Sequence, residues 1–76
     1  MRGESYGVYV QPPTSEWWTL VFLTLFPHVA KLRATMLRRS NVLPHVQYIL
    51  IRFSPGQDAP HEFQGDPLPG WEVSIL

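Results

Sequence analysis

The chain has 76 residues, no cysteine and a formal net charge of zero. A chain of this length buries only about 60% of its unfolded surface, and without cysteine it has no disulfide or thiolate metal site to add stability. Zero net charge gives little long-range attraction to a polyanion such as nucleic acid. We therefore expect a single small domain, residues 1–76, of marginal independent stability.

The N-terminal segment, residues 1–14, combines a short β-prone run with two prolines. Tyr6, Val8 and Val10 alternate with other residues, which predicts a short strand over about 6–11, either at a sheet edge or as an extended arm. One arginine and no following hydrophobic core predict no cleavable signal peptide. The compartment stays open, because a lack of cysteine fits any compartment.

The longest apolar stretch runs into a basic segment, and together they predict one long helix over about 15–39. Thr14 or Ser15 can cap its start after the two prolines. Pro27 would remove an internal hydrogen bond, so we expect a kink there, or two helices meeting near Phe26. Apolar residues at three- and four-residue spacing predict a buried stripe on this helix: Phe22, Leu25, Phe26, Val29, Leu32, Met36 and Leu37.

The first half of this predicted helix is apolar around its whole circumference, so protein or lipid must enclose it. The run from Trp17 to Ala30 is shorter than the roughly 20 residues of a membrane span. The alternatives are a core helix, a helix lying in or dipping into a membrane interface, and a short or tilted span. The candidate membrane or partner contacts are Trp17, Trp18, Phe22 and Phe26. The basic flank, placed at lipid headgroups or at acidic groups of a partner, comprises Lys31, Arg33, Arg38 and Arg39.

Three segments follow the basic flank. Residues 46–53 are β-branched and aromatic, which predicts a strand buried on both faces within the segment 45–53. Residues 54–70 hold four prolines and three glycines and predict a long surface loop that wraps a neighbour. Residues 71–76 alternate as a half-buried closing strand. The predicted fold class is α+β, with one long helix and two or three short strands.

Charge is unevenly distributed along the chain. Five cations and no acid lie between Lys31 and Arg52, whereas residues 53–76 carry four acids and no cation. We expect the acidic part to fold back onto the basic helix, and the alternative is a basic surface that faces phosphate or anionic lipid.

No set of residues predicts chemistry. The three histidines, His28, His45 and His61, lack the spacing that would put two ligands on one helical face. There is no cysteine nucleophile, and the acids that could form a carboxylate pair lie in the predicted loop, which is too mobile for catalysis. We therefore expect no enzyme, no metal, no cofactor and no small-molecule substrate. A cationic helix end with nearby aromatics does not by itself favour nucleic-acid binding over a solvated helix and core aromatics.

Two short resemblances occur near the end of the chain. Leu68-Pro69-Gly70-Trp71-Glu72 resembles the opening of a WW domain, but the rest of that module is missing, so no WW function follows. Ser74-Ile75-Leu76 resembles a class I PDZ-binding terminus, with a hydroxyl two residues before an apolar carboxyl-terminal residue. Ser74 and Leu76 are therefore a candidate interaction motif.

The sequence predicts a non-catalytic accessory or structural subunit of a larger, membrane-associated assembly. Its expected partners are other protein subunits and a membrane interface. The alternative is a free-standing soluble α+β protein-binding module, either homodimeric or of the peptide or PDZ type. A small nucleic-acid-binding protein and a chain without an evolved role are further interpretations.

Overall fold

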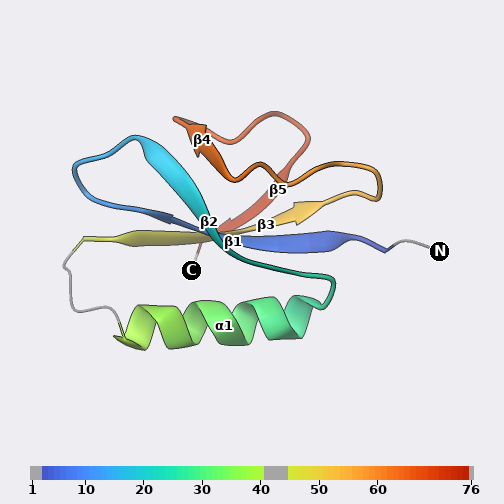
Figure 1. The fold of residues 1–76 in the computed structure, drawn as a ribbon, viewed down its shortest axis with the longest axis horizontal. Helices are drawn as coiled ribbons and strands as arrows, with labels where there is room; N and C mark the ends of the chain where they lie inside the picture. The colour runs from blue at the N-terminus through green and yellow to red at the C-terminus, as the bar shows by residue number, and fades with distance from the viewer. Residues whose placement is uncertain (1–2, 41–44, 76) are drawn as a thin grey trace.

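The computed structural model describes residues 3–40 and 45–75, and within them the chain is mostly strand. Five antiparallel strands form one curved sheet in the order β4-β2-β1-β3-β5, and a single helix packs beside it (Figure 1). The elements are β1 (Ser5–Gln11), β2 (Trp17–Thr24), α1 (Pro27–Ser40), β3 (Gln47–Phe53), β4 (Glu62–Gln64) and β5 (Glu72–Ile75).

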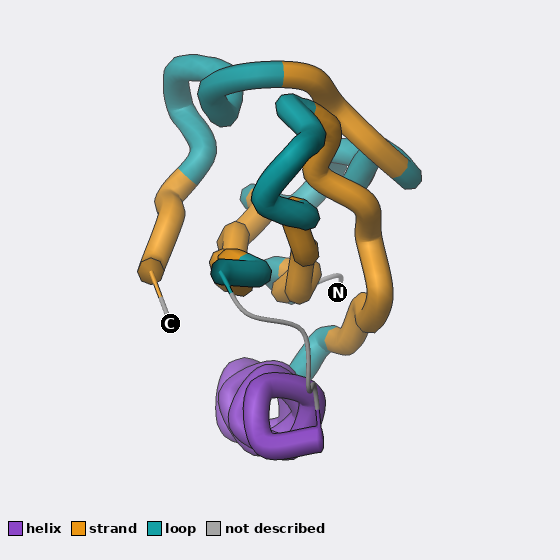
Figure 2. The backbone as a smooth tube through the Cα atoms, turned by 90° about the vertical axis from the view of Figure 1, so that its left-hand side faces the viewer, coloured by secondary structure: helices purple, strands orange, loops and turns teal. Residues whose placement is uncertain are grey.

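The centre of the sheet is β1, which pairs with β2 on one side and with β3 on the other. Because β1 is antiparallel to both neighbours, β2 and β3 run in the same direction, and α1 forms the crossover connection between them in a split β-α-β arrangement. The helix covers one face of the sheet, and the segment that contains β4 covers the other (Figure 2). The N-terminal strand is therefore central, not the edge strand or arm that the sequence predicts.

The predicted helix over 15–39 is wrong, because its first half is the strand β2. The segment is rich in aromatic and β-branched residues, which favour a strand. A β-bulge lies where Val8 and Tyr9 of β1 pair with Phe22 and Leu20 of β2, leaving Val21 as the extra residue. Before the bulge the even-numbered residues of β2 lie on one face of the sheet, and after it they lie on the other. Both faces of β2 are therefore apolar, and the sequence does not alternate between apolar and polar residues.

Pro27 is the first residue of α1, and neither a kink nor a junction of two helices occurs there. Proline is tolerated at this position because the first N–H groups of a helix have no partner within it. The amide of Ala30 donates to the carbonyl of Phe26 at 3.1 Å, which makes Phe26 the cap residue. The preceding turn is held by Thr24, whose hydroxyl accepts from the amide of Phe26 at 3.2 Å.

The helix buries two alanines, not the predicted stripe of large apolar residues. Ala30 and Ala34 are fully buried against Val8 and Leu50 of the sheet, and Leu37 is partly buried beside them. Leu32 and Met36 are instead 62% and 54% exposed. Small residues let the helix approach the sheet closely, and the larger residues of α1 remain on its flank and outer side.

The second core lies on the other face of the sheet and is aromatic. The rings of Phe63 and Trp71 pack edge to face at 5.3 Å, and both rings contact the sheet aromatics. The buried members of this core are Tyr9, Trp18, Ile49, Ile51 and Phe53. Segment 54–70 is thus not a loop throughout, because it contains β4 and covers the protein's own sheet, and its contact with a neighbour stays a prediction.

Gly7 of β1 lies under this aromatic core, and we expect its replacement by alanine to destabilise the fold. A Cβ at Gly7 would lie 2.9 Å from Cε1 of Tyr9, 3.1 Å from Cδ1 of Leu20 and 3.3 Å from Cε2 of Phe53. Such overpacking costs about 1–3 kcal/mol of unfolding free energy, measurable by urea denaturation. Gly3→Ala is the matched control, because nothing lies within 4 Å of the added methyl. Equal stability of the two variants would contradict the packing described.

Candidate functional site

The structure separates the four apolar residues that the sequence groups as candidate contacts. Trp18 is only 7% exposed, and its ring stacks on that of Phe63 with centroids 6.3 Å apart, so it belongs to the aromatic core. Trp17 and Phe26 are 44% and 58% exposed. Phe22 is half-buried, and the guanidinium of Arg33 lies 4.9 Å from the centre of its ring. Three of the four therefore reach the surface.

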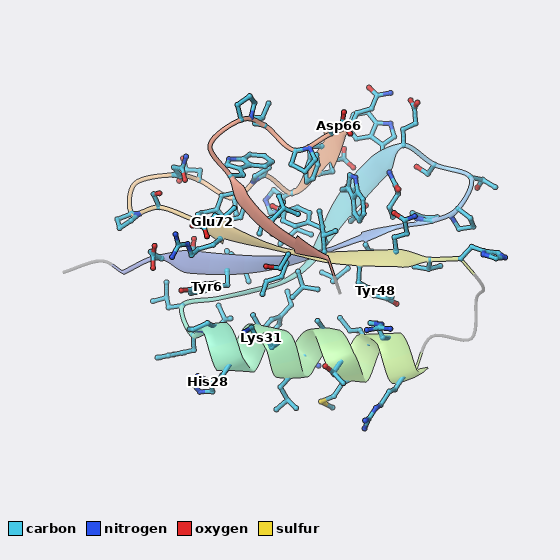
Figure 3. All side chains as sticks on the ribbon, turned by 180° about the vertical axis from the view of Figure 1, so that it is seen from behind. Tyr6, His28, Lys31, Tyr48, Asp66 and Glu72 are labelled. Atoms are coloured by element: carbon cyan, nitrogen blue, oxygen red, sulfur yellow. The ribbon has the colours of Figure 1, made fainter. Side chains whose placement is uncertain are left out.

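The four residues of the basic flank all lie on α1 and are exposed. Arg33 lies on the side of the helix that faces β2, whereas Lys31 lies beside Leu50, Arg52 and Glu72 on the side that faces β3 and β5 (Figure 3). Arg38 and Arg39 are in the last turn, where they complement the helix dipole. Within the described residues none of the four forms an ion pair.

Most of the acidic part of the chain lies away from this helix. Asp66 lies on the opposite side of the sheet from α1, in the segment that also carries Asp58 and Glu62 (Figures 1 and 3). The ion pairs that the structure shows join Arg52 to Glu4, at 3.2 Å, and to Glu72. The expected folding of the acidic half onto the helix is therefore wrong for Asp58, Glu62 and Asp66, whereas Glu72 lines the same hollow as Lys31.

One half of β2 has a neighbouring strand on one side only. β4 pairs with Trp17, Trp18 and Thr19, and the amide of Leu20 donates to the carbonyl of His61 at 2.8 Å. Beyond this point β2 pairs with β1 alone, so in the described part of the chain Val21–Thr24 form an open sheet edge. Val21 and Leu23 are 43% and 50% exposed along this edge.

Apolar surface continues from the open edge on both faces of the sheet. On the helix face a groove of about 180 Å³ is lined by Phe22, Val29, Leu32, Arg33 and Met36. On the other face a hollow of about 270 Å³ lies beside Leu23 and Leu25 and includes Asp58. We call Val21–Thr24, together with Val29, Leu32, Arg33 and Met36, the β2 edge site.

The described residues contain no group of three histidine, aspartate or glutamate side chains that could hold a metal ion. Burial raises the pKa of Tyr9 to about 12, and its hydroxyl donates to the carbonyl of Pro60 at 2.7 Å, which assigns this tyrosine a structural role. Among the described helices none is long and apolar enough to cross a membrane.

The candidate C-terminal motif is only partly described. Ser74 lies in β5, opposite Leu50 of β3, so it already takes part in the protein's own sheet. Leu76 lies outside the described residues. A strand that is already paired on one side could extend to a partner only through its outer edge.

Of the β2 edge site, the sequence identifies only Phe22 and Arg33 as candidate contact residues. It predicts Val21 and Leu23 within a helix, and Leu32 and Met36 in the buried stripe of that helix. The run Trp17-Trp18-Thr19 followed by Val21 carries the β propensity that could have identified a strand. The half of β2 that lacks a second neighbouring strand is set by where β4 ends. Because β4 lies far along the chain from β2, the local sequence does not show this pairing.

Comparisons of the chain with protein-family models, with curated proteins and with solved structures found no match.

Proposed function

We propose that the protein is a non-catalytic accessory subunit that binds an extended segment of another protein at the β2 edge site. The observation that supports this proposal is the open edge Val21–Thr24. Edge strands are usually protected against pairing by charged residues, proline or a covering element, and this segment has no charged residue and no proline. An incoming strand would form main-chain hydrogen bonds with it and place alternate side chains in the groove and in the hollow.

Charge supports a partner of different sequence over a second copy of the chain. An antiparallel pair of two β2 edges would be related by a two-fold axis perpendicular to the sheet, which places both helices on the same face. The two Arg33 flanks, each without an ion pair among the described residues, would then approach one another. A partner strand with acidic side chains on the helix face avoids this repulsion and complements Arg33.

A single lysine at the open edge should abolish this binding. We expect Leu23→Lys to leave the fold intact, because Leu23 is half exposed, and to reduce peptide binding at least tenfold by placing an ammonium group beside the incoming strand. The measurement is selection of a displayed random 12-residue peptide library on the purified chain, followed by titration of the selected peptides. Leu68→Lys is the matched control, because Leu68 is 60% exposed in segment 54–70.

Selected peptides should combine alternating apolar residues with acidic ones, and should protect the amides of Val21–Thr24 from hydrogen exchange. Peptides that bind both lysine variants equally would show that the edge is not the site. A concentration-dependent dimer that Leu23→Lys dissociates would replace the proposed partner with a second copy. Association of the assembly with a membrane stays a prediction from the sequence.

A further inference from the structure

The curved sheet does not close into a barrel, and a cavity lies beside the start of β3. β4 and β5 are the two outer strands, and the segment between them passes over the aromatic core (Figures 1 and 2). The cavity measures about 460 Å³, and four of its lining residues, Val46 to Ile49, come from the start of β3 and the residue before it. Its volume is within the range of about 300–1,000 Å³ that is typical of small-molecule sites.

The walls of this cavity are mainly apolar and come from separate elements of the fold. Trp18 of β2, Ile49 of β3, Val73 of β5 and Pro67 of the β4–β5 connection contribute to its lining. Val73 is 39% exposed, so an apolar ligand that covers it would remove apolar surface from water. The cavity can therefore hold the apolar part of a ligand. It is a different surface from the β2 edge site.

Three of the described residues that line this cavity carry polar side chains. Arg38 reaches it from the last turn of α1, Gln47 lies at the start of β3, and the hydroxyl of Tyr48 donates to the carbonyl of Leu37 at 3.4 Å. None of the described lining residues is acidic, and Arg38 forms no ion pair with a described residue. A planar guanidinium without a carboxylate partner binds a carboxylate through two parallel hydrogen bonds.

We infer that this cavity binds a small organic carboxylate. The apolar body of the ligand lies against Trp18, Ile49 and Val73, and its carboxylate accepts hydrogen bonds from Arg38, with the amide of Gln47 as a further donor. A single cation in an apolar cavity matches one negative charge, whereas a nucleotide or another polyanion would require several cations. The inference goes beyond the proposed protein-binding role, because it concerns a different surface and a different class of ligand.

The test compares two ligands that differ only in charge, 4-phenylbutanoate and 4-phenylbutanamide. Titrations are followed by amide and indole resonances in ¹H–¹⁵N spectra of the full chain. We expect the carboxylate to shift the resonances of Trp18, Gln47 and Val73 and to bind about tenfold more tightly than the amide. Arg38→Gln should remove this preference, and Arg39→Gln should retain it, because Arg39 does not line the cavity.

Three outcomes would overturn the inference: no shift at 10 mM ligand, equal affinity for the acid and the amide, or equal loss of binding in both arginine variants. Both arginines are exposed, so thermal melts should show that the variants remain folded. Leu23→Lys should bind 4-phenylbutanoate normally. Failure of this inference and failure of the protein-binding proposal are therefore distinguishable.

Discussion

Replacement of Phe53 by alanine should reduce the free energy of unfolding by about 3–5 kcal/mol, the usual cost of removing a buried phenylalanine ring. Phe53 is fully buried, and its ring contacts Trp71 edge to face at 5.2 Å and Tyr9 at 6.4 Å. A 76-residue domain has a total stability of roughly 4–11 kcal/mol. The variant should therefore melt more than about 10 °C below the parent, or not fold at all, as measured by near-UV circular dichroism.

Phe26→Ala is the matched control for this prediction. Phe26 is 58% exposed at the start of α1, so its replacement should change stability by no more than about 0.5 kcal/mol. The comparison separates a core phenylalanine from a surface one in the same chain. If both variants melted within a few degrees of the parent, the aromatic face of the sheet would not be the core of this fold.

Strands could be predicted where the sequence alternates or is continuously β-branched. Strands β1, β3 and β5 lie close to the predicted ranges 6–11, 46–53 and 71–76. In β3, apolar residues on both faces correctly indicate a strand covered on each side, since Leu50 and Ile51 are buried on opposite faces. The failures lie in the stretch where strand and helix signals follow one another without a break, in segment 54–70, where β4 lies in a predicted loop, and in the position of β1, which is central and not at an edge.

The wrong helix has a specific physical cause. β2 changes its buried face at the bulge near Val21, so Trp18 and Leu20 face the aromatic core while Phe22 faces the helix. If the bulge is not recognised, Phe22 and the apolar residues of α1 recur at three- and four-residue spacing, which is the pattern of one long helix. Pro27 does affect the helix, but it lies at the first residue of α1, where proline is favoured, and not at a kink.

The candidate site depends on non-local pairing and could not be located from the sequence. Trp18 pairs with Phe63, far along the chain, and is covered by the segment that the sequence treats as a surface loop. The chain thus hides one of its two adjacent tryptophans within its own fold. Its exposed apolar surface lies instead beyond the end of β4, around Val21 and Leu23, because three residues of β4 cannot cover eight residues of β2.

A rise in pH from 10 to 12 should destabilise the protein through Tyr9. Burial raises the pKa of Tyr9 to about 12 from an unfolded value of 10, so between these pH values the unfolded chain loses a proton that the folded chain retains. The contribution of neutral Tyr9 is complete below pH 10 and falls by about 1.4 kcal/mol per pH unit until the folded pKa is reached. Urea denaturation at several pH values should therefore show a loss of about 2 kcal/mol over this interval.

Tyr9→Phe isolates this effect from every other group that titrates in alkali. The variant loses the hydrogen bond to Pro60 and leaves that carbonyl without this donor, so at pH 8 it should be less stable by about 1–3 kcal/mol. Between pH 10 and 12 its stability should fall by about 2 kcal/mol less than that of the parent, because no phenol remains at position 9 to ionise. Tyr6→Phe, which changes a half-buried tyrosine on the helix face, should retain the parent's alkaline loss. An equally steep loss in Tyr9→Phe would show that burial of Tyr9 is not what links folding to alkaline pH.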